Sequence, residues 1–95
     1  MKAGIRRVQI TRRAEKQLRM MPIHIRRKML LWVATVEADG LEEARRVPGY
    51  HDEPLGGQRT GQRSIRLNRS YRAIYEVKGE ILRFVSVEEV SKHDY

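Results

Sequence analysis

The sequence predicts an α+β fold of order β-α-α-β-β-β, in which a twisted antiparallel sheet carries two N-terminal helices packed on one face. Three observations predict it. Apolar residues follow helical spacing in the first half, they alternate with polar residues in the second, and a stretch rich in proline and glycine separates the two. With 95 residues, 40% of them hydrophobic, the chain is expected to form one domain, residues 1–95.

The N-terminal half is expected to begin with a short strand at residues 5–10. Thr11 is a candidate N-cap for a helix that runs to about Arg19. Pro22 suits the first position of a second helix, which Gly40 would end. The apolar stripe of that second helix consists of Ile25, Met29, Trp32, Val33 and Val36.

The C-terminal half is predicted to be a set of hairpins. Residues 41–46 could add a helical turn, and residues 47–61 indicate an ordered loop. Period-two alternation follows, with a three-residue turn at 68–70, a two-residue turn at 78–79 and a central strand at 81–87.

These turns predict a register. The first pairs Leu67 with Tyr71, Arg66 with Arg72, and Ile65 with Ala73; the second pairs Val77 with Glu80, Ile74 with Arg83, and Ala73 with Phe84. One face would then gather Ile65, Leu67, Ala73, Tyr75, Leu82 and Phe84 under the helices, and the other Ser64, Arg66, Arg72 and Arg83. Arg66 and Arg72 would repel each other unless an anion binds, or unless Glu76 or an acid from the loop neutralises them.

The charge of the chain indicates a polyanionic partner. The net charge is +8, and residues 1–30 carry ten Lys or Arg against Glu15 alone. Nucleic acid or the ribosome is therefore the expected partner. The N-terminus lacks the apolar core of a secretory signal and no apolar run could span a membrane, so no membrane role is expected. The absence of cysteine fits a reducing cytoplasm and rules out thiolate metal sites, and the three scattered histidines make no metal cluster.

The loop before the hairpins is expected to present one carboxylate, that of Glu53, to the arginine-bearing strands. Residues 52–59 read Asp-Glu-Pro-Leu-Gly-Gly-Gln-Arg, and arginine recurs at the polar positions that follow. A base beside a strip of cations is what phosphodiester cleavage requires. A clamp that merely binds nucleic acid would look the same.

Residues 52–75 and the tail at 92–95 resemble the RelE/ParE toxin superfamily. The residues that carry the resemblance are Glu-Pro-Leu-Gly-Gly, Gly-Gln-Arg-Ser-Ile-Arg-Leu-Asn, Tyr-Arg-Ala-Ile-Tyr and Lys-His-Asp-Tyr. Within the superfamily the chain is most similar to the RelE, YoeB and HigB messenger-RNA interferases. The resemblance implies a small RelE-like domain, cleavage of messenger RNA in the ribosomal A site, and an antitoxin that neutralises the protein.

The resemblance also implies a set of site residues. Glu53 matches the catalytic glutamate of YoeB-type members, Arg72 an arginine that supports the scissile phosphate, and Arg66 a lysine of RelE-type members. Tyr95 matches a terminal tyrosine, but YoeB-type tails end His-Tyr, whereas His93 here stands one place earlier. Either His93 or Tyr95 would therefore be the general acid.

In that chemistry the 2′-hydroxyl attacks the adjacent phosphate with Glu53 as base, and neither a metal nor another cofactor is needed. Arg59, Arg63, Arg83, Lys92 and the basic residues of the helices would hold RNA backbone. Two other functions remain open: a ParE-like inhibitor of DNA gyrase without hydrolytic activity, and a basic RNA-binding domain without enzymatic activity.

Overall fold

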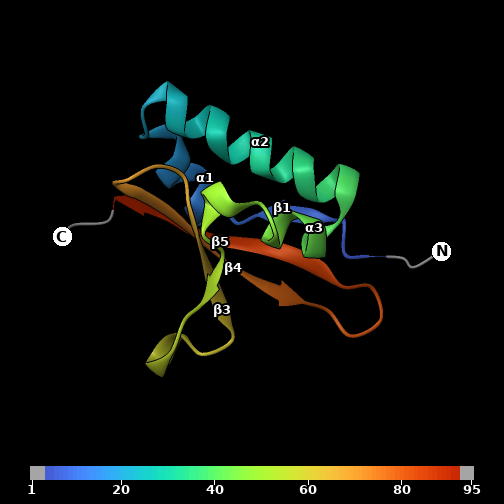
Figure 1. Ribbon diagram of the computed structural model, residues 1–95. Helices are drawn as coiled ribbons and strands as arrows, with labels where there is room; N and C mark the ends of the chain where they lie inside the picture. Colours follow the sequence, from blue (N-terminus) through green and yellow to red (C-terminus); the bar gives the residue numbers. More distant parts are fainter. Residues whose placement is uncertain (1–3, 93–95) are drawn as a thin grey trace.

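The computed structural model describes residues 4–92, which form a five-stranded sheet with three α-helices (Figure 1). In chain order the elements are β1 (Val8–Ile10), α1 (Arg12–Arg19), α2 (Ile23–Asp39), α3 (Leu41–Arg45), the 3-10 turn η1 (Pro48–Tyr50), β2 (Glu53–Pro54), the 3-10 turn η2 (Gly57–Arg59), β3 (Gln62–Arg66), β4 (Tyr71–Lys78) and β5 (Phe84–Lys92). The α+β class and the order of the main elements are as the sequence predicts. Two additions are α3, expected only as a helical turn, and β2, which lies inside the expected loop.

The strands are ordered β1-β5-β4-β3-β2 across the sheet. Neighbouring strands are antiparallel except β1, which runs parallel to β5, so the sheet is not wholly antiparallel as expected. The α-helices lie on one face (Figure 1); within residues 4–92 no α-helix covers the other face, here called the open face. The first strand is shorter than the expected 5–10, although Ile5 and Arg7 still accept backbone hydrogen bonds from Leu41 and Val85, both at 2.8 Å.

The helix boundaries follow local signals. The Thr11 Oγ1 accepts a hydrogen bond from the Ala14 N–H at 3.1 Å, which confirms it as the N-cap of α1. The second helix begins one residue later than predicted, so Pro22 is the N-cap of α2 rather than its first residue. Gly40 ends α2 with a φ of 91°, a conformation that favours glycine. None of the helices in residues 4–92 is long and apolar enough to cross a membrane.

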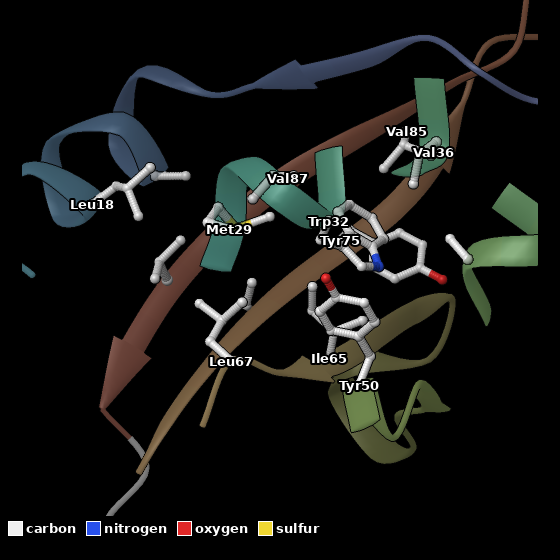
Figure 2. Close-up of a cluster of buried hydrophobic side chains, with 14 of the residues drawn as sticks. Leu18, Met29, Trp32, Val36, Tyr50, Ile65, Leu67, Tyr75, Val85 and Val87 are labelled. Carbon is white, nitrogen blue, oxygen red and sulfur yellow. The ribbon is translucent and has the colours of Figure 1, made fainter. Parts of the chain in front are cut away.

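The core lies between the helices and the covered face of the sheet (Figure 2). Trp32 of α2 and Tyr75 of β4 are fully buried at its centre, with ring centroids 5.1 Å apart. Around them pack Ala14, Leu18, Ile25, Met29, Val36, Leu41, Ala44, Tyr50, Ile65, Leu67, Ala73, Val85, Val87 and Val90. The predicted stripe of α2 therefore supplies the core, except that Val33 is only half-buried.

The hairpin between β3 and β4 has the predicted register. Ile65 pairs with Ala73 and Arg66 with Arg72, and the Leu67 N–H donates to the Tyr71 carbonyl at 2.9 Å. The Asn68 side-chain oxygen accepts hydrogen bonds from the N–H groups of residues 70 and 71, which closes the turn. Arg66 and Arg72 are thus direct cross-strand neighbours on the open face.

The predicted register of β4 and β5 is wrong. Residues 79–83 form a longer loop, and Val77 pairs with Val85 instead of Glu80. The loop leaves Ile81 and Leu82 93% and 77% exposed, so Leu82 is not in the core. The physical reason is burial: this register buries Val85, Val87 and Val90 of β5 completely or nearly so, and it lets β5 pair with β1 as well.

A β-bulge interrupts the same pair of strands. Ile74 pairs with Glu89 but Tyr75 pairs with Val87, so Glu88 is the extra residue. The bulge places Val87 and Val90 on the covered face although they are three residues apart. As a consequence, Glu89 lies on the open face.

Gly79 is a position where a side chain is expected to destabilise the fold. Its φ is 91°, and a Cβ there would lie 2.3 Å from the Leu82 carbonyl oxygen. We expect Gly79→Ala to lower the free energy of unfolding by about 1–3 kcal/mol. Urea denaturation measures the change, with Gly49→Ala as control because nothing lies within 4 Å of a Cβ at that position. Equal stability of the two variants would contradict the loop conformation.

Candidate active site

A pocket of about 370 Å³ opens on the open face of the sheet. Four strands and the segment after β2 contribute to it, so it depends on the whole sheet rather than on one hairpin. The side chains that line it are Glu53, Leu55, Arg59, Ser64, Arg72, Ile74, Glu89 and Ser91. Two larger hollows, of about 520 and 500 Å³, adjoin residues 4–7 at the other end of the sheet, and neither contains a residue of the predicted catalytic set.

Glu53 and Arg72 meet over this pocket. Glu53 lies in the two-residue strand β2 opposite Ser64 of β3, and Arg72 lies one strand further along. The Arg72 Nη1 is 3.5 Å from the Glu53 Oε1, and the two side chains are 18% and 59% exposed. Because an ion pair of this length and exposure is weak, the Arg72 guanidinium can exchange its partner for an incoming anion.

Further polar groups lie beside this pair. The Arg72 Nη1 also donates to the Ser64 Oγ at 3.2 Å, and Ser64 is buried. Arg66 pairs with Arg72 across the strands but is not among the residues that line the pocket, and its buried Nε has no hydrogen-bond partner. An acid from the loop therefore contacts one of the two opposed arginines, as one of the alternatives above expected. The other acid considered, Glu76, instead contacts Gln62 and Lys78.

Glu89 is a pocket residue that the sequence analysis missed. Its Oε1 is 3.1 Å from the Arg59 Nη2 and 3.5 Å from the Arg13 Nη2, and its side chain is 13% exposed. It links η2, β5 and α1 at the edge of the pocket. The bulge explains the omission, because strict alternation after Val87 would turn Glu89 towards the core. The sequence did contain a signal for the bulge, because the apolar residues Val87 and Val90 are three positions apart instead of the two that regular alternation gives.

The remaining predicted site residues do not gather at this pocket. Arg63 lies opposite Tyr75, and its Nε donates to the Asp52 Oδ1 at 2.6 Å. Arg83 belongs to the 79–83 loop and lines the 520 Å³ hollow, not the face of Arg72, because the predicted β4–β5 register is wrong. Lys92 ends β5 opposite Tyr71 and is exposed. His93 and Tyr95 lie outside the described residues.

The arrangement is suited to proton transfer beside an anion. Glu53 offers a proton acceptor, and Arg72, Arg59 and the adjacent Arg66 offer donors to phosphoryl oxygens. In residues 4–92 no cluster of three or more His, Asp or Glu side chains could hold a metal ion. The acid and the arginine come from strands separated by β3, so the fold alone brings them together.

Comparison with solved structures identifies the fold. The chain matches no protein-family model and no curated protein sequence. Its structure is nevertheless similar to the YoeB–YefM complex from Staphylococcus aureus, with a TM-score of 0.68, 18% identity, and coverage of 98% of this chain and 100% of that one.

Two further structures agree. The DinJ–YafQ toxin–antitoxin complex of E. coli has a TM-score of 0.66 at 19% identity and covers 94% of each chain. A YoeB/ParE toxin from Agrobacterium tumefaciens has a TM-score of 0.58 at 22% identity, over 93% of this chain and 99% of that one. The chain therefore has the fold of the RelE/YoeB-type toxins, and the RelE-like fold expected from the sequence is confirmed.

Proposed function

We propose that this chain, which has the fold of RelE/YoeB-type toxins, is the toxin of a type II toxin–antitoxin system. It would act in the cytoplasm as a ribosome-dependent endoribonuclease and would stop translation by cutting messenger RNA in the A site. The single observation that carries the proposal is the meeting of Glu53 with Arg72 over one pocket, 3.5 Å apart, beside Arg66 and Arg59.

The proposed reaction is an internal transfer at phosphorus. Glu53 takes the proton of a ribose 2′-hydroxyl, whose oxygen attacks the adjacent phosphate while the bond from phosphorus to the 5′-oxygen breaks. His93 or Tyr95 gives a proton to that leaving oxygen. The products are a 2′,3′-cyclic phosphate and a 5′-hydroxyl, so atoms and charge balance without water or a metal.

The arginines would stabilise the charge that grows on the phosphoryl oxygens. Arg72 is held in place by Ser64 at 3.2 Å, so little reorganisation is needed when the phosphate binds. Arg66, paired with Arg72 across the strands, would add a second positive charge beside the phosphate. A cross-strand pair of cations that is unfavourable alone becomes favourable once the anion is present.

In vitro translation followed by primer extension on the messenger tests the proposal. Codon-aligned cuts that vanish in Glu53→Ala and in Arg72→Ala support it. Intact messenger together with a DNA-damage response in cells would instead indicate gyrase inhibition of the ParE type. Tight RNA binding without cuts would indicate a non-enzymatic RNA-binding domain.

A cognate antitoxin is the partner expected in addition to the ribosome. Two of the similar structures are complexes, YoeB with YefM and YafQ with DinJ. A basic chain with an uncovered sheet face suits an acidic peptide laid over it. Co-expression with the protein of the neighbouring reading frame tests this: growth should recover and the two chains should purify together. Harmless expression of the chain alone would count against the pairing.

Glu89 is expected to compete with RNA for Arg59 and Arg13. Replacing it with glutamine removes one negative charge from the pocket and takes the ion-pair partner away from both guanidinium groups, although Arg59 keeps its hydrogen bond to Gln62. We expect Glu89→Gln to bind a short single-stranded RNA roughly fivefold more tightly, equivalent to about 1 kcal/mol, with a steeper salt dependence. Fluorescence anisotropy at several salt concentrations measures both quantities.

Glu88→Gln is the matched control for this prediction. It makes the same charge change one residue away, but the Glu88 side chain contacts Lys78 and Ser86 rather than the pocket arginines. Equal affinities in the two variants would mean that net charge alone, not release of Arg59, governs binding.

A further inference from the structure

Asp52, the residue before Glu53, has its side chain fully enclosed, whereas the Glu53 side chain is 59% exposed. Each oxygen of the Asp52 carboxylate has its own donor. The Arg63 Nε donates to Oδ1 and the Tyr75 hydroxyl donates to Oδ2, both at 2.6 Å. A buried carboxylate is tolerated only when it is paired in this way, so the contacts hold Asp52 in one orientation.

The contacts continue into the core. The Arg45 Nε donates to the Tyr75 hydroxyl oxygen at 3.3 Å, and the Arg45 Nη1 is 3.0 Å from Glu42. The Tyr75 ring packs against Trp32. These contacts join α3, β3 and β4 to the segment that precedes β2, so Asp52 is tied to the rigid centre of the molecule (Figure 2 shows Tyr75 beside Trp32).

The electrostatics keep the donors in their hydrogen-bonding forms. Burial raises the pKa of Tyr75; the hydrogen bond from Arg45 lowers it, and the one to Asp52 raises it further, so that the hydroxyl keeps its proton. Burial opposes the charged form of Arg63, but the hydrogen bond and charge of Asp52 outweigh it, and the pKa of Arg63 is raised. Both groups therefore remain donors to Asp52 throughout the neutral range.

The orientation of Asp52 decides that of Glu53. Successive side chains of an extended segment point to opposite faces, so an inward Asp52 turns Glu53 outward, towards Arg72. Strand β2 has only two residues, and the Leu55 N–H donates to the Gln62 carbonyl at 2.9 Å just after it. His51, on the other side of Asp52, has a φ of 46°, a left-handed conformation that residues with a Cβ adopt at a cost. The conformational preferences of the backbone therefore do not by themselves fix the segment around Asp52 and Glu53.

We propose that Asp52 and Tyr75 are positioning residues for the base: they anchor the segment before β2 from the covered side and thereby present the Glu53 carboxylate to the pocket. That this anchoring serves catalysis rests on the proposed function. The anchoring itself is a property of the fold and does not depend on the reaction. Neither residue contacts the pocket, and the hydroxyl of Tyr75 is separable from the packing of its ring.

The variant that tests this role is Tyr75→Phe, which removes the donor to Asp52, and with it the acceptor of the Arg45 Nε, but keeps the aromatic contact with Trp32. We expect the kcat of messenger cleavage to fall about tenfold to a hundredfold while KM stays within about twofold, because Arg72, Arg66 and Arg59 still bind RNA. Amide exchange at Leu55 should accelerate, since β2 loses its anchor. The loss of kcat in Tyr75→Phe should persist at temperatures well below the melting temperature of the variant, because it does not result from unfolding.

Tyr50→Phe is the matched control, because Tyr50 is also a buried tyrosine of this core, and the hydrogen-bond donors to the Asp52 carboxylate are Arg63 and Tyr75 rather than Tyr50. It should leave kcat and Leu55 exchange unchanged. Asp52→Asn, which keeps the volume and one acceptor oxygen, should be less impaired than Asp52→Ala. If Asp52→Ala does not fold, Tyr75→Phe decides the matter alone.

The outcomes separate the two proposals. If the wild-type chain cuts no messenger, the proposed function fails, and Leu55 exchange in Tyr75→Phe still tests the anchoring. Unchanged exchange and unchanged kcat in Tyr75→Phe overturn the inference, and so does a loss of kcat that disappears when the temperature is lowered.

Discussion

Arg72→Ala is expected to lower the rate of messenger cleavage by about 10²–10³, corresponding to ~3–4 kcal/mol of transition-state stabilisation. Arg72 lies at the centre of the pocket, where Ser64 holds it and Glu53 is 3.5 Å away. An arginine preorganised in this way stabilises phosphoryl oxygens as they gain charge, which alanine cannot do. Single-turnover cleavage on programmed ribosomes measures the loss, and a growth assay shows it as loss of toxicity.

Folding should survive this change. Arg72 is 18% exposed and its removal leaves the buried Ser64 hydroxyl without that donor, so we expect a loss of about 1–2 kcal/mol in the free energy of unfolding. Arg46→Ala is the control: it removes the same charge from α3's C-terminal end, where Arg46 pairs with Glu43. Retained toxicity in an Arg72→Ala protein that melts normally would count against the site assignment.

Glu53→Gln is expected to lower the cleavage rate by about 10²–10⁴, because a neutral amide cannot accept the proton of the attacking hydroxyl. The substitution keeps the size of the side chain and leaves the exposed strand β2 free to pair with β3. RNA affinity should stay equal or rise, since Arg72 loses an acidic partner. Single-turnover rates and anisotropy, measured on the same preparation, separate the two effects.

Glu43→Gln serves as the control for the charge, because Glu43 is similarly exposed and far from the pocket. It should cleave at the wild-type rate. Cleavage by Glu53→Gln at near wild-type rate would remove Glu53 from the base role. Glu89 would then be the next carboxylate to examine, since it lies in the same pocket.

The parts of the fold that could be predicted from the sequence are those set by local rules. Thr11 caps α1, Gly40 ends α2, and the apolar stripe around Trp32 forms the core, because capping and helical periodicity act over a few residues. The turn at 68–70 determines the β3–β4 register in the same way. That register correctly placed Arg66 opposite Arg72.

The β4–β5 register could not be predicted from local rules. A glycine after Lys78 favoured a two-residue turn, but the register is decided by how the three valines of β5 pack beneath the helices and by the pairing of β5 with β1. Both depend on residues far apart in the chain; the partners in β1 and β5, such as Val8 and Val85, are more than 70 positions apart. This error placed Arg83 on the open face, and the bulge in β5, which local rules do not predict either, places Glu89 in the pocket.

The sequence by itself determined the helices, the first hairpin and the residue types needed for acid–base chemistry beside an anion, because these depend on neighbours within a few residues. Only the tertiary structure decided which of those residues meet. Glu53 reaches Arg72 because β2 adds to the sheet edge, Glu89 enters the pocket because of a bulge, and Arg63 is directed to the buried Asp52. Such placements follow from burial and strand pairing across the whole chain, which no short segment encodes.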